Sequence, residues 1–237
     1  MSVPYRRVIL KLSGEALSAD DKPFCHDKFM RVAQVLTEIP RMGIQAAVVI
    51  GGGNVWRGRR GDSLRMGAVA ADQMGMLATL QNCLYMRDTL DHLDCKATVM
   101  SGVDIPRFAE SYNTAAALER LEQGCILLLA CGLGNPFFST DSAVVLRAME
   151  LECDAILMAK NVDGVYTADP AAHSDAILLP DISYEGAAER KLQVMDTVAF
   201  IMLRDSNIPL VRIFGLEPPE NMLKVLTGDP MGSMLHP

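Results

Sequence analysis

Short apolar runs alternate with longer stretches of helical period along this 237-residue chain. Runs such as 45–50 are rich in β-branched residues or Leu, whereas Phe29, Val32, Ala33 and Leu36 recur at the three- and four-residue spacing of one helix face. In an α/β protein, helices that link parallel strands cover both faces of the sheet. The alternation therefore predicts an α/β fold with a mostly parallel central sheet sandwiched between helices.

The alternation continues to the end of the sequence. Strands are predicted at 7–12, 45–50, 96–100, 125–130, 155–159 and 210–214, and helices at 29–43, 69–93, 114–122, 142–152, 197–205 and 220–227. No linker rich in Ser, Gly or Pro divides the chain, and 237 residues lie within the range of large single α/β domains. We expect one domain covering residues 1–237.

The predicted helix at 69–93 is unusual because its apolar side chains are not confined to one stripe. Met74, Leu77, Leu80, Leu84 and Met86 spread around much of the helix. A helix in the centre of the core would explain this pattern. An oligomer interface would explain it equally well, since Met-rich faces are adaptable contact surfaces.

Charge and composition exclude several classes of protein. The net charge is −7 and no basic run occurs, which argues against a nucleic-acid partner. No apolar run is long enough to cross a bilayer, and the N-terminus lacks the pattern of a signal peptide. Six cysteines form no CxxC pair and four histidines lack zinc-ligand spacing, so we expect reduced, buried thiols and no metal site made of protein ligands. The expected location is the cytoplasm.

Three glycine-rich segments follow predicted strands. They begin at Lys11, Gly51 and Gly132. In parallel sheets ligands bind beyond the carboxyl ends of the strands, where free backbone amides attract phosphates. The P-loop pattern GxxxxGK[ST] is absent, and the dinucleotide pattern GxGxxG fails because Trp56 and Phe137 stand where its third glycine would be. A dehydrogenase is therefore a weak alternative to a phosphate-binding site of another kind.

Two cations and a carboxylate adjoin these segments. Lys11 and Arg57 are placed to stabilise a transferring phosphoryl group, which is negative throughout the reaction. Asp141 precedes a predicted helix, so it is expected to cap that helix, to orient Lys11 and help to hold Mg²⁺, or to do both. The segment 160–170 is either an ordinary turn or, through Tyr166, a pocket for a purine and its ribose.

Five motifs together resemble a known family. KLSGE, VIGGGNVWRG, ADQMGMLATLQN, GNPFFSTDSA and KNVDGVYTADP are similar to the amino acid kinase superfamily and, within it, to the uridylate kinases of bacteria. The resemblance covers nearly the whole chain in the same order. It implies an enzyme of pyrimidine nucleotide biosynthesis that transfers the γ-phosphoryl group of MgATP to UMP, forming UDP and ADP.

The resemblance also implies roles for individual residues. The implied ATP site consists of Lys11, Leu12, Ser13, Gly14, Gly53, Arg57, Lys160, Asn161, Tyr166 and Asp169. The implied UMP site consists of Gly52, Asp72, Leu133, Gly134, Asn135, Pro136, Phe137, Phe138, Ser139 and Thr140. The residues implied in catalysis are Lys11, Arg57, Asp141 and Asp196, with Mg²⁺ carried by ATP rather than by dedicated protein ligands.

The family further implies a homohexamer, allosteric behaviour and inhibition by UTP. Two alternatives remain: a kinase of an amino-acid or acyl carboxylate on the same fold, and a non-catalytic nucleotide-binding or storage protein. Asp72 and the GNPFFST segment argue against the first, because a carboxylate substrate would not need them. The complete set of Lys11, Arg57 and Asp141 argues against the second.

Overall fold

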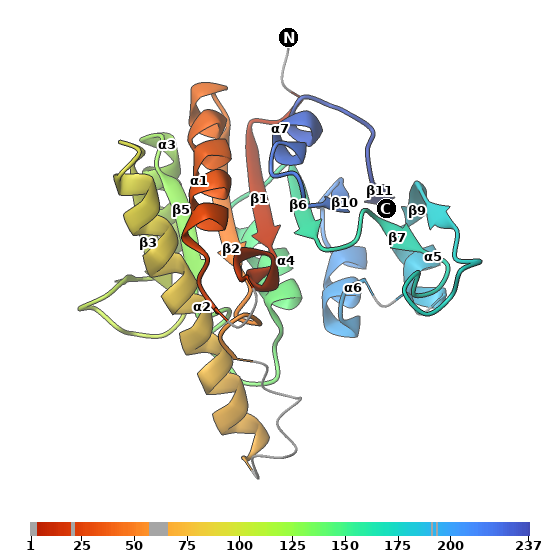
Figure 1. Ribbon diagram of the computed structural model, residues 1–237, viewed down its shortest axis with the longest axis horizontal. Helices are drawn as coiled ribbons and strands as arrows, with labels where there is room; N and C mark the ends of the chain where they lie inside the picture. Colours follow the sequence, from red (N-terminus) through yellow and green to blue (C-terminus); the bar gives the residue numbers. More distant parts are fainter. Residues whose placement is uncertain (1–3, 20–21, 57–65, 191, 193) are drawn as a thin grey trace.

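A computed structural model describes residues 4–19, 22–56, 66–190, 192 and 194–237. The strands of its main sheet lie in the order β4 (Glu110–Ser111), β3 (Ala97–Ser101), β5 (Ile126–Ala130), β2 (Gln45–Ile50), β1 (Arg7–Leu12), β6 (Ala155–Lys160), β10 (Val211–Gly215), β11 (Ser233–His236) and β9 (Asp181–Ser183) (Figure 1). The described neighbours pair in parallel except β10 and β11, which are antiparallel. A separate antiparallel ribbon joins β7 (Val165–Tyr166) to β8 (Leu178–Leu179).

Helices cover both faces of the sheet. One layer consists of α1 (His26–Arg41), α2 (Ala68–Asp91) and α7 (Asn221–Leu226), and the other of α3 (Thr114–Glu122), α4 (Thr140–Glu150), α5 (Tyr184–Glu189) and α6 (Thr197–Arg204) (Figure 1). The side chains of the central strand β1 show why both faces are covered. Val8 and Leu10 pack against the first helix layer and Ile9 packs against the second, and all three are fully buried. Successive side chains of a strand point to opposite faces, so a run that is apolar throughout requires cover on both. The predicted α/β sandwich is confirmed.

The elements that the sequence predicted occur within a few residues of their expected ends. Helix α1 begins at His26 rather than at the predicted residue 29. Helix α4 begins at Thr140 rather than at the predicted residue 142, because Ser139 caps it. The elements that the sequence did not predict are short: η1 (Gly14–Leu17), β4, β7, β8, β9, α5 and β11. With two to six residues each, they carry too few positions for a period of 2.0 or 3.6 to appear.

Helix α2 divides into two halves with different surroundings. Toward its end, Leu80, Cys83 and Met86 are buried in the core. Toward its start, Met74 and Leu77 are 41% and 45% exposed in the single chain, and the helix extends past the sheet (Figure 1). The core explanation therefore holds for the second half, and the interface stays a prediction for the first. Among the described residues, no helix combines the length and apolar character needed to cross a bilayer.

The six cysteines are free thiols. Cys83, Cys131 and Cys153 are buried, and burial raises the pKa of Cys153 to about 12. The other three, Cys25, Cys95 and Cys125, are half-buried. The expectation of buried thiols therefore holds for half of them.

Candidate active site

The three glycine-rich loops converge at one edge of the sheet. They follow β1, β2 and β5, which are neighbouring parallel strands, and β6 lies on the other side of β1. Leu12 at the end of β1 is level with Ile50 of β2 and Ala159 of β6. Because parallel strands end at the same edge, the loops that leave them share one space. The convergence expected from the sequence is confirmed in this geometry.

The loops after β1 and β2 pack backbone against backbone. The Gly51 amide donates a 3.0 Å hydrogen bond to the Leu12 carbonyl. A Cβ atom added to Gly14 would lie 2.0 Å from the Gly51 carbonyl oxygen and 2.5 Å from Asn54 Oδ1. Glycine is therefore required at position 14 for the close approach of two main chains.

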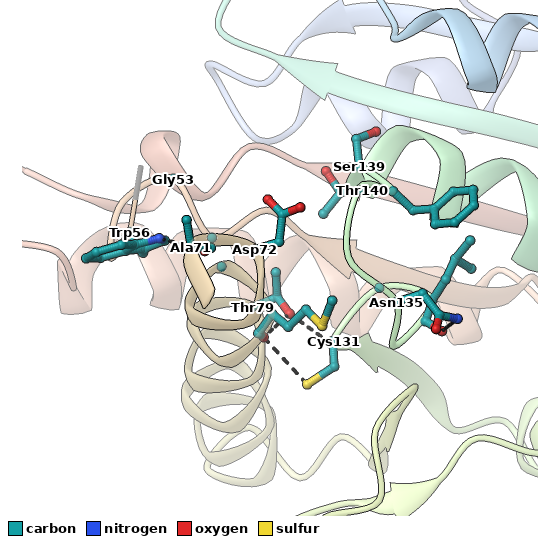
Figure 2. A pocket seen from close by; sticks show the side chains of 15 residues that line it. Gly53, Trp56, Ala71, Asp72, Thr79, Cys131, Asn135, Ser139 and Thr140 are labelled. Atoms are coloured by element: carbon teal, nitrogen blue, oxygen red, sulfur yellow. Dashed lines mark hydrogen bonds between the residues drawn. The ribbon is translucent and has the colours of Figure 1, made fainter. Parts of the chain in front are cut away.

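A first cavity opens between α2 and the loops after β2 and β5. It is lined by Gly52, Gly53, Trp56, Ala71, Asp72, Gly75, Met76, Thr79, Cys131, Gly132, Leu133, Asn135, Phe138, Ser139 and Thr140 (Figure 2). Asp72 of α2 lines this cavity together with Ser139, the cap of α4, and Thr140, its first residue (Figure 2). Asp72 Oδ2 accepts a 2.7 Å hydrogen bond from the Phe137 amide, and the Phe137 side chain is 62% exposed. The loop is thus fixed by its backbone at Phe137.

An ion pair joins β1 to α4 beside this cavity. Lys11 Nζ lies 2.8 Å from Asp141 Oδ1, and the two side chains are 14% and 15% exposed. Ser139 Oγ accepts the Asp141 amide at 2.9 Å and is the cap of α4, so the interpretation of Asp141 as the helix cap is wrong. Asp141 lies instead in the first helical turn, where its carboxylate is free to orient the ammonium group. Both groups are shielded enough from water for their attraction to hold the lysine in place.

Asp196 connects the starts of two helices. It caps α6 by accepting the Ala199 amide at 2.9 Å, and it also accepts hydrogen bonds from the hydroxyl groups of Ser139, the cap of α4, and Ser142 in the first turn of α4. Partial burial raises the pKa of Asp196, but the hydrogen bonds from Ser139, Ala199 and Ser142 outweigh that effect and bring the pKa below its usual value. The carboxylate is therefore ionised at neutral pH and holds α4 against α6.

A second cavity, of about 700 Å³, also reaches the start of α4. Asp141, Lys160 and Asp196 line it together with apolar side chains of α5 and α6. Lys160 Nζ donates to the Val194 carbonyl. Burial lowers the pKa of Lys160 to about 8; Asp141 opposes this shift, and the charge of Lys11 adds to it. A second cation is thus present near Lys11.

A third cavity, of about 470 Å³, adjoins the second, because Leu192 and Val194 line both. Tyr166 and Asp169 line it as well. The Tyr166 hydroxyl donates to Asp163 at 2.7 Å, and this hydrogen bond raises the pKa of the tyrosine. The cavity has the mixed apolar and polar lining that suits a nucleoside.

Some of the predicted site residues do not line a cavity. The Leu12 side chain is fully buried in the core, Asn161 is exposed at the end of β6, and Gly134 packs on Gly102, whose carbonyl oxygen would lie 2.2 Å from an added Cβ. Pro136 and Phe137 do not line the first cavity. The prediction for Arg57 lies outside the described residues.

Sequence reasoning missed several residues of the first cavity. Trp56, Met76 and Cys131 line it, and so does Thr79. A signal was present for those on α2: Met76 and Thr79 follow Asp72 at four and seven residues, the spacing of one helix face. For Trp56 and Cys131 the sequence offered no comparable period.

Comparison with known proteins assigns the family. The model of the amino acid kinase family matches residues 6–214. The uridylate kinase of Colwellia psychrerythraea is 44% identical over 98% of this chain and 94% of its own length, and that of Xanthomonas oryzae is 44% identical over 98% and 97%. The crystal structure of UMP kinase from Bacillus anthracis superposes with a TM-score of 0.94 at 34% identity, covering 98% of this chain and 96% of the other. The chain therefore belongs to the amino acid kinase family, and within it to the uridylate kinases.

Proposed function

We infer that this chain is a UMP kinase, which transfers the γ-phosphoryl group of ATP to UMP and releases UDP and ADP. The observation that carries this conclusion is the Lys11–Asp141 ion pair at the start of α4, which both cavities reach: Thr140 lines the first and Asp141 lines the second. Ser139 and Thr140 line the first cavity and Asp141 lines the second, so both cavities reach the start of α4. Two nucleotides placed in them would meet at Lys11.

The assignment of nucleotides follows from the lining of the cavities. We place UMP in the first cavity, where Asp72 can accept hydrogen bonds from ribose hydroxyls and Ser139 and Thr140 approach its phosphate. The phosphates of ATP lie beside Lys160 in the second cavity, and its adenosine lies beside Tyr166 in the third. The N-terminus of α4 faces the reacting phosphates, where its free amides and dipole favour negative charge.

The mechanism requires charge stabilisation and alignment. A nonbridging oxygen of the UMP phosphate attacks the γ-phosphorus in line, and ADP leaves with the bridging oxygen. Lys11 stabilises the charge on the transferring group, and Asp141 holds Lys11 in position. No general base is needed, because a phosphate monoester with a second pKa of about 6 is already mostly dianionic at neutral pH. Arg57 is proposed to add a second positive charge from the loop after β2.

The side chains at the site fit an Mg²⁺ ion that is carried by ATP. Within the described part of the chain, no three His, Cys, Asp or Glu side chains gather as metal ligands. Asp141 offers a carboxylate, whereas the Asp196 oxygens accept hydrogen bonds from serines and a backbone amide. Mg²⁺ commonly takes one or two carboxylates and completes its shell with phosphates and water. When bound, it would neutralise part of the phosphate charge.

A panel of acceptors tests the proposed function. With MgATP, the purified protein should phosphorylate UMP far faster than CMP, acetylglutamate or aspartate, measured by coupled ADP release. The reason is that the first cavity offers Asp72 and hydroxyl groups to a nucleotide. Preference for acetylglutamate or aspartate would instead identify a carboxylate kinase, and binding of UMP without turnover would identify a non-catalytic nucleotide-binding protein.

The pKa of Lys160 predicts a pH dependence. With a pKa of about 8, the free enzyme loses the charge of Lys160 as pH rises from 7 to 9. If Lys160 contacts the ATP phosphates, kcat/KM for ATP should fall over this range, since kcat/KM reports the free enzyme. Lys160→Gln should be slower at pH 7 and should lack this fall. Lys224→Gln, an exposed lysine of α7, serves as control and should keep the wild-type profile; an unchanged profile in Lys160→Gln would contradict the role.

We further propose a homohexamer with allosteric inhibition by UTP, built from one domain over residues 1–237 and located in the cytoplasm. Membership of the uridylate kinases supports these proposals. The exposed apolar side chains at the start of α2, Val69, Met74 and Leu77, support contact between subunits.

A further inference from the structure

Two buried polar side chains of α2 hold the loops that form the first cavity. They are Thr79 and Asn82, which are 4% and 0% exposed. They are three positions apart in the sequence, so they lie on the same side of the helix. A polar side chain is rarely buried without a full set of hydrogen bonds, and the partners of these two explain their position.

Asn82 fixes the loop after β2. Its Nδ2 donates to the Gly51 carbonyl at 2.8 Å and to Asn54 Oδ1 at 2.8 Å, and its Oδ1 accepts from Asn54 Nδ2 at 2.9 Å. Asn54 Nδ2 also donates to the Pro23 carbonyl at 2.7 Å. The side-chain amides of Asn82 and Asn54 thus bind each other reciprocally, and Asn82 also holds the Gly51 carbonyl. The residue after Gly51 is Gly52, which lines the cavity.

Thr79 fixes the loop after β5. Its hydroxyl donates to the Met76 carbonyl at 2.7 Å and accepts the Cys131 amide at 2.8 Å (Figure 2). Cys131 has a φ of +60°, a left-handed conformation that is unfavourable for a residue other than glycine. The hydrogen bond therefore acts at a strained point, directly before Gly132 and Leu133 of the loop.

We propose that Thr79 and Asn82 are positioning residues that set the distance between the two loops of the first cavity. A helix is stiff over one turn, so hydrogen bonds from two positions on one face fix both loops to a common support. The inference rests on the proposed function only for the identity of the ligand, UMP. Asn82, being fully buried, can act only through the backbone that it holds.

Thr79→Val tests the loop after β5, because it keeps the shape of the side chain and removes the hydroxyl. The Cys131 amide then loses its acceptor, and we expect the KM for UMP to rise about tenfold, the scale for a buried donor left unpaired, while the KM for ATP stays within about twofold. Thr79→Ser keeps the hydroxyl and should resemble the wild type. Amide exchange measured by NMR should be faster at Cys131 in Thr79→Val than in Thr79→Ser.

Asn82→Ala and Asn54→Ala test the loop after β2. Each should lower kcat/KM for UMP about tenfold, and the double variant should be no worse than the poorer single variant, because the two amides act as a unit. Asn221→Ala is the matched control. Asn221 is a buried asparagine of α7 that donates to the carbonyls of Gly215 and Glu217, so its loss should lower the melting temperature without changing kcat/KM.

Different outcomes separate this inference from the proposed function. A wild-type protein that does not phosphorylate UMP overturns the function, and the exchange rate of the Cys131 amide then decides the positioning role alone. Unchanged UMP kinetics and unchanged Cys131 exchange in Thr79→Val would overturn the role of Thr79. Losses that multiply in the Asn54 and Asn82 double variant, or an equal loss of kcat/KM in Asn221→Ala, would overturn the role of Asn82.

Discussion

Replacing Lys11 with Ala should lower kcat for UMP phosphorylation about a hundredfold or more, the scale observed when one stabiliser of transition-state charge is removed. The reason lies in the position of the ammonium group, which Asp141 holds at 2.8 Å beside the start of α4, between the sites proposed for the two nucleotides. The effect should appear in kcat rather than in the KM for UMP, because the charge on the transferring group is what Lys11 stabilises. Steady-state kinetics with saturating MgATP measures it.

Two controls separate chemistry from folding in this experiment. Lys96→Ala removes an exposed lysine from the opposite edge of the sheet, just before β3, and should keep full turnover. A thermal melt of Lys11→Ala should remain cooperative but have a lower midpoint, because the substitution leaves the largely buried Asp141 carboxylate without its partner. Unchanged kcat in a folded Lys11→Ala protein would falsify the role of Lys11.

Gly14→Ala should also have a large effect, on stability as well as on activity. The added methyl group would lie 2.0 Å from the Gly51 carbonyl oxygen, which belongs to the main chain and cannot rotate away. The loops after β1 and β2 must then separate, at an expected loss of about 1–3 kcal/mol in the free energy of unfolding. Turnover should fall at least tenfold because the loop after β1 follows Lys11 closely and the loop after β2 carries Gly53.

Gly67→Ala is the matched control for this substitution. Gly67 precedes α2 with a φ of −65°, and an added Cβ there meets nothing within 4 Å. Urea denaturation should place Gly67→Ala near the wild type and Gly14→Ala well below it. Equal midpoints for the two variants would show that the loops after β1 and β2 yield without strain, contrary to their close packing.

The layers of the fold could be predicted from the sequence because each central strand is apolar on both faces. In β1 the consecutive side chains of Val8, Ile9 and Leu10 are all apolar and buried, so helices must cover both faces of the strand. The order of strands and helices along the chain could be predicted from the same pattern. The pairing at the far edge could not be predicted. β9 has three residues and β11 has four. β11 lies between β10, to which it is antiparallel, and β9, to which it is parallel, and this placement depends on tertiary packing rather than on a local pattern.

The candidate site was partly predictable for a similar reason. Lys11 and the glycine loops are placed by the parallel strands that precede them, so their convergence follows from topology. The capping of α4 was not foreseen, because Ser139 and Asp141 are both favourable cap residues and only the backbone distinguishes them. Thr79 was missed because a buried threonine in a helix looks like an ordinary core position until the Cys131 amide is seen beside it.

The central place of β1 has a consequence for how the molecule folds. Val8 pairs with Ala46 of β2, which is near in the sequence, and with Ala155 of β6, which is distant. The pairing of β1 with β2 therefore closes a short loop, whereas its pairing with β6 closes a long one. Contacts between distant parts of a chain form slowly because a long loop must close first. Since Lys160 and the loop that follows it arrive only with β6, we expect competence to bind ATP to develop late in refolding, after the half of the molecule that holds the first cavity.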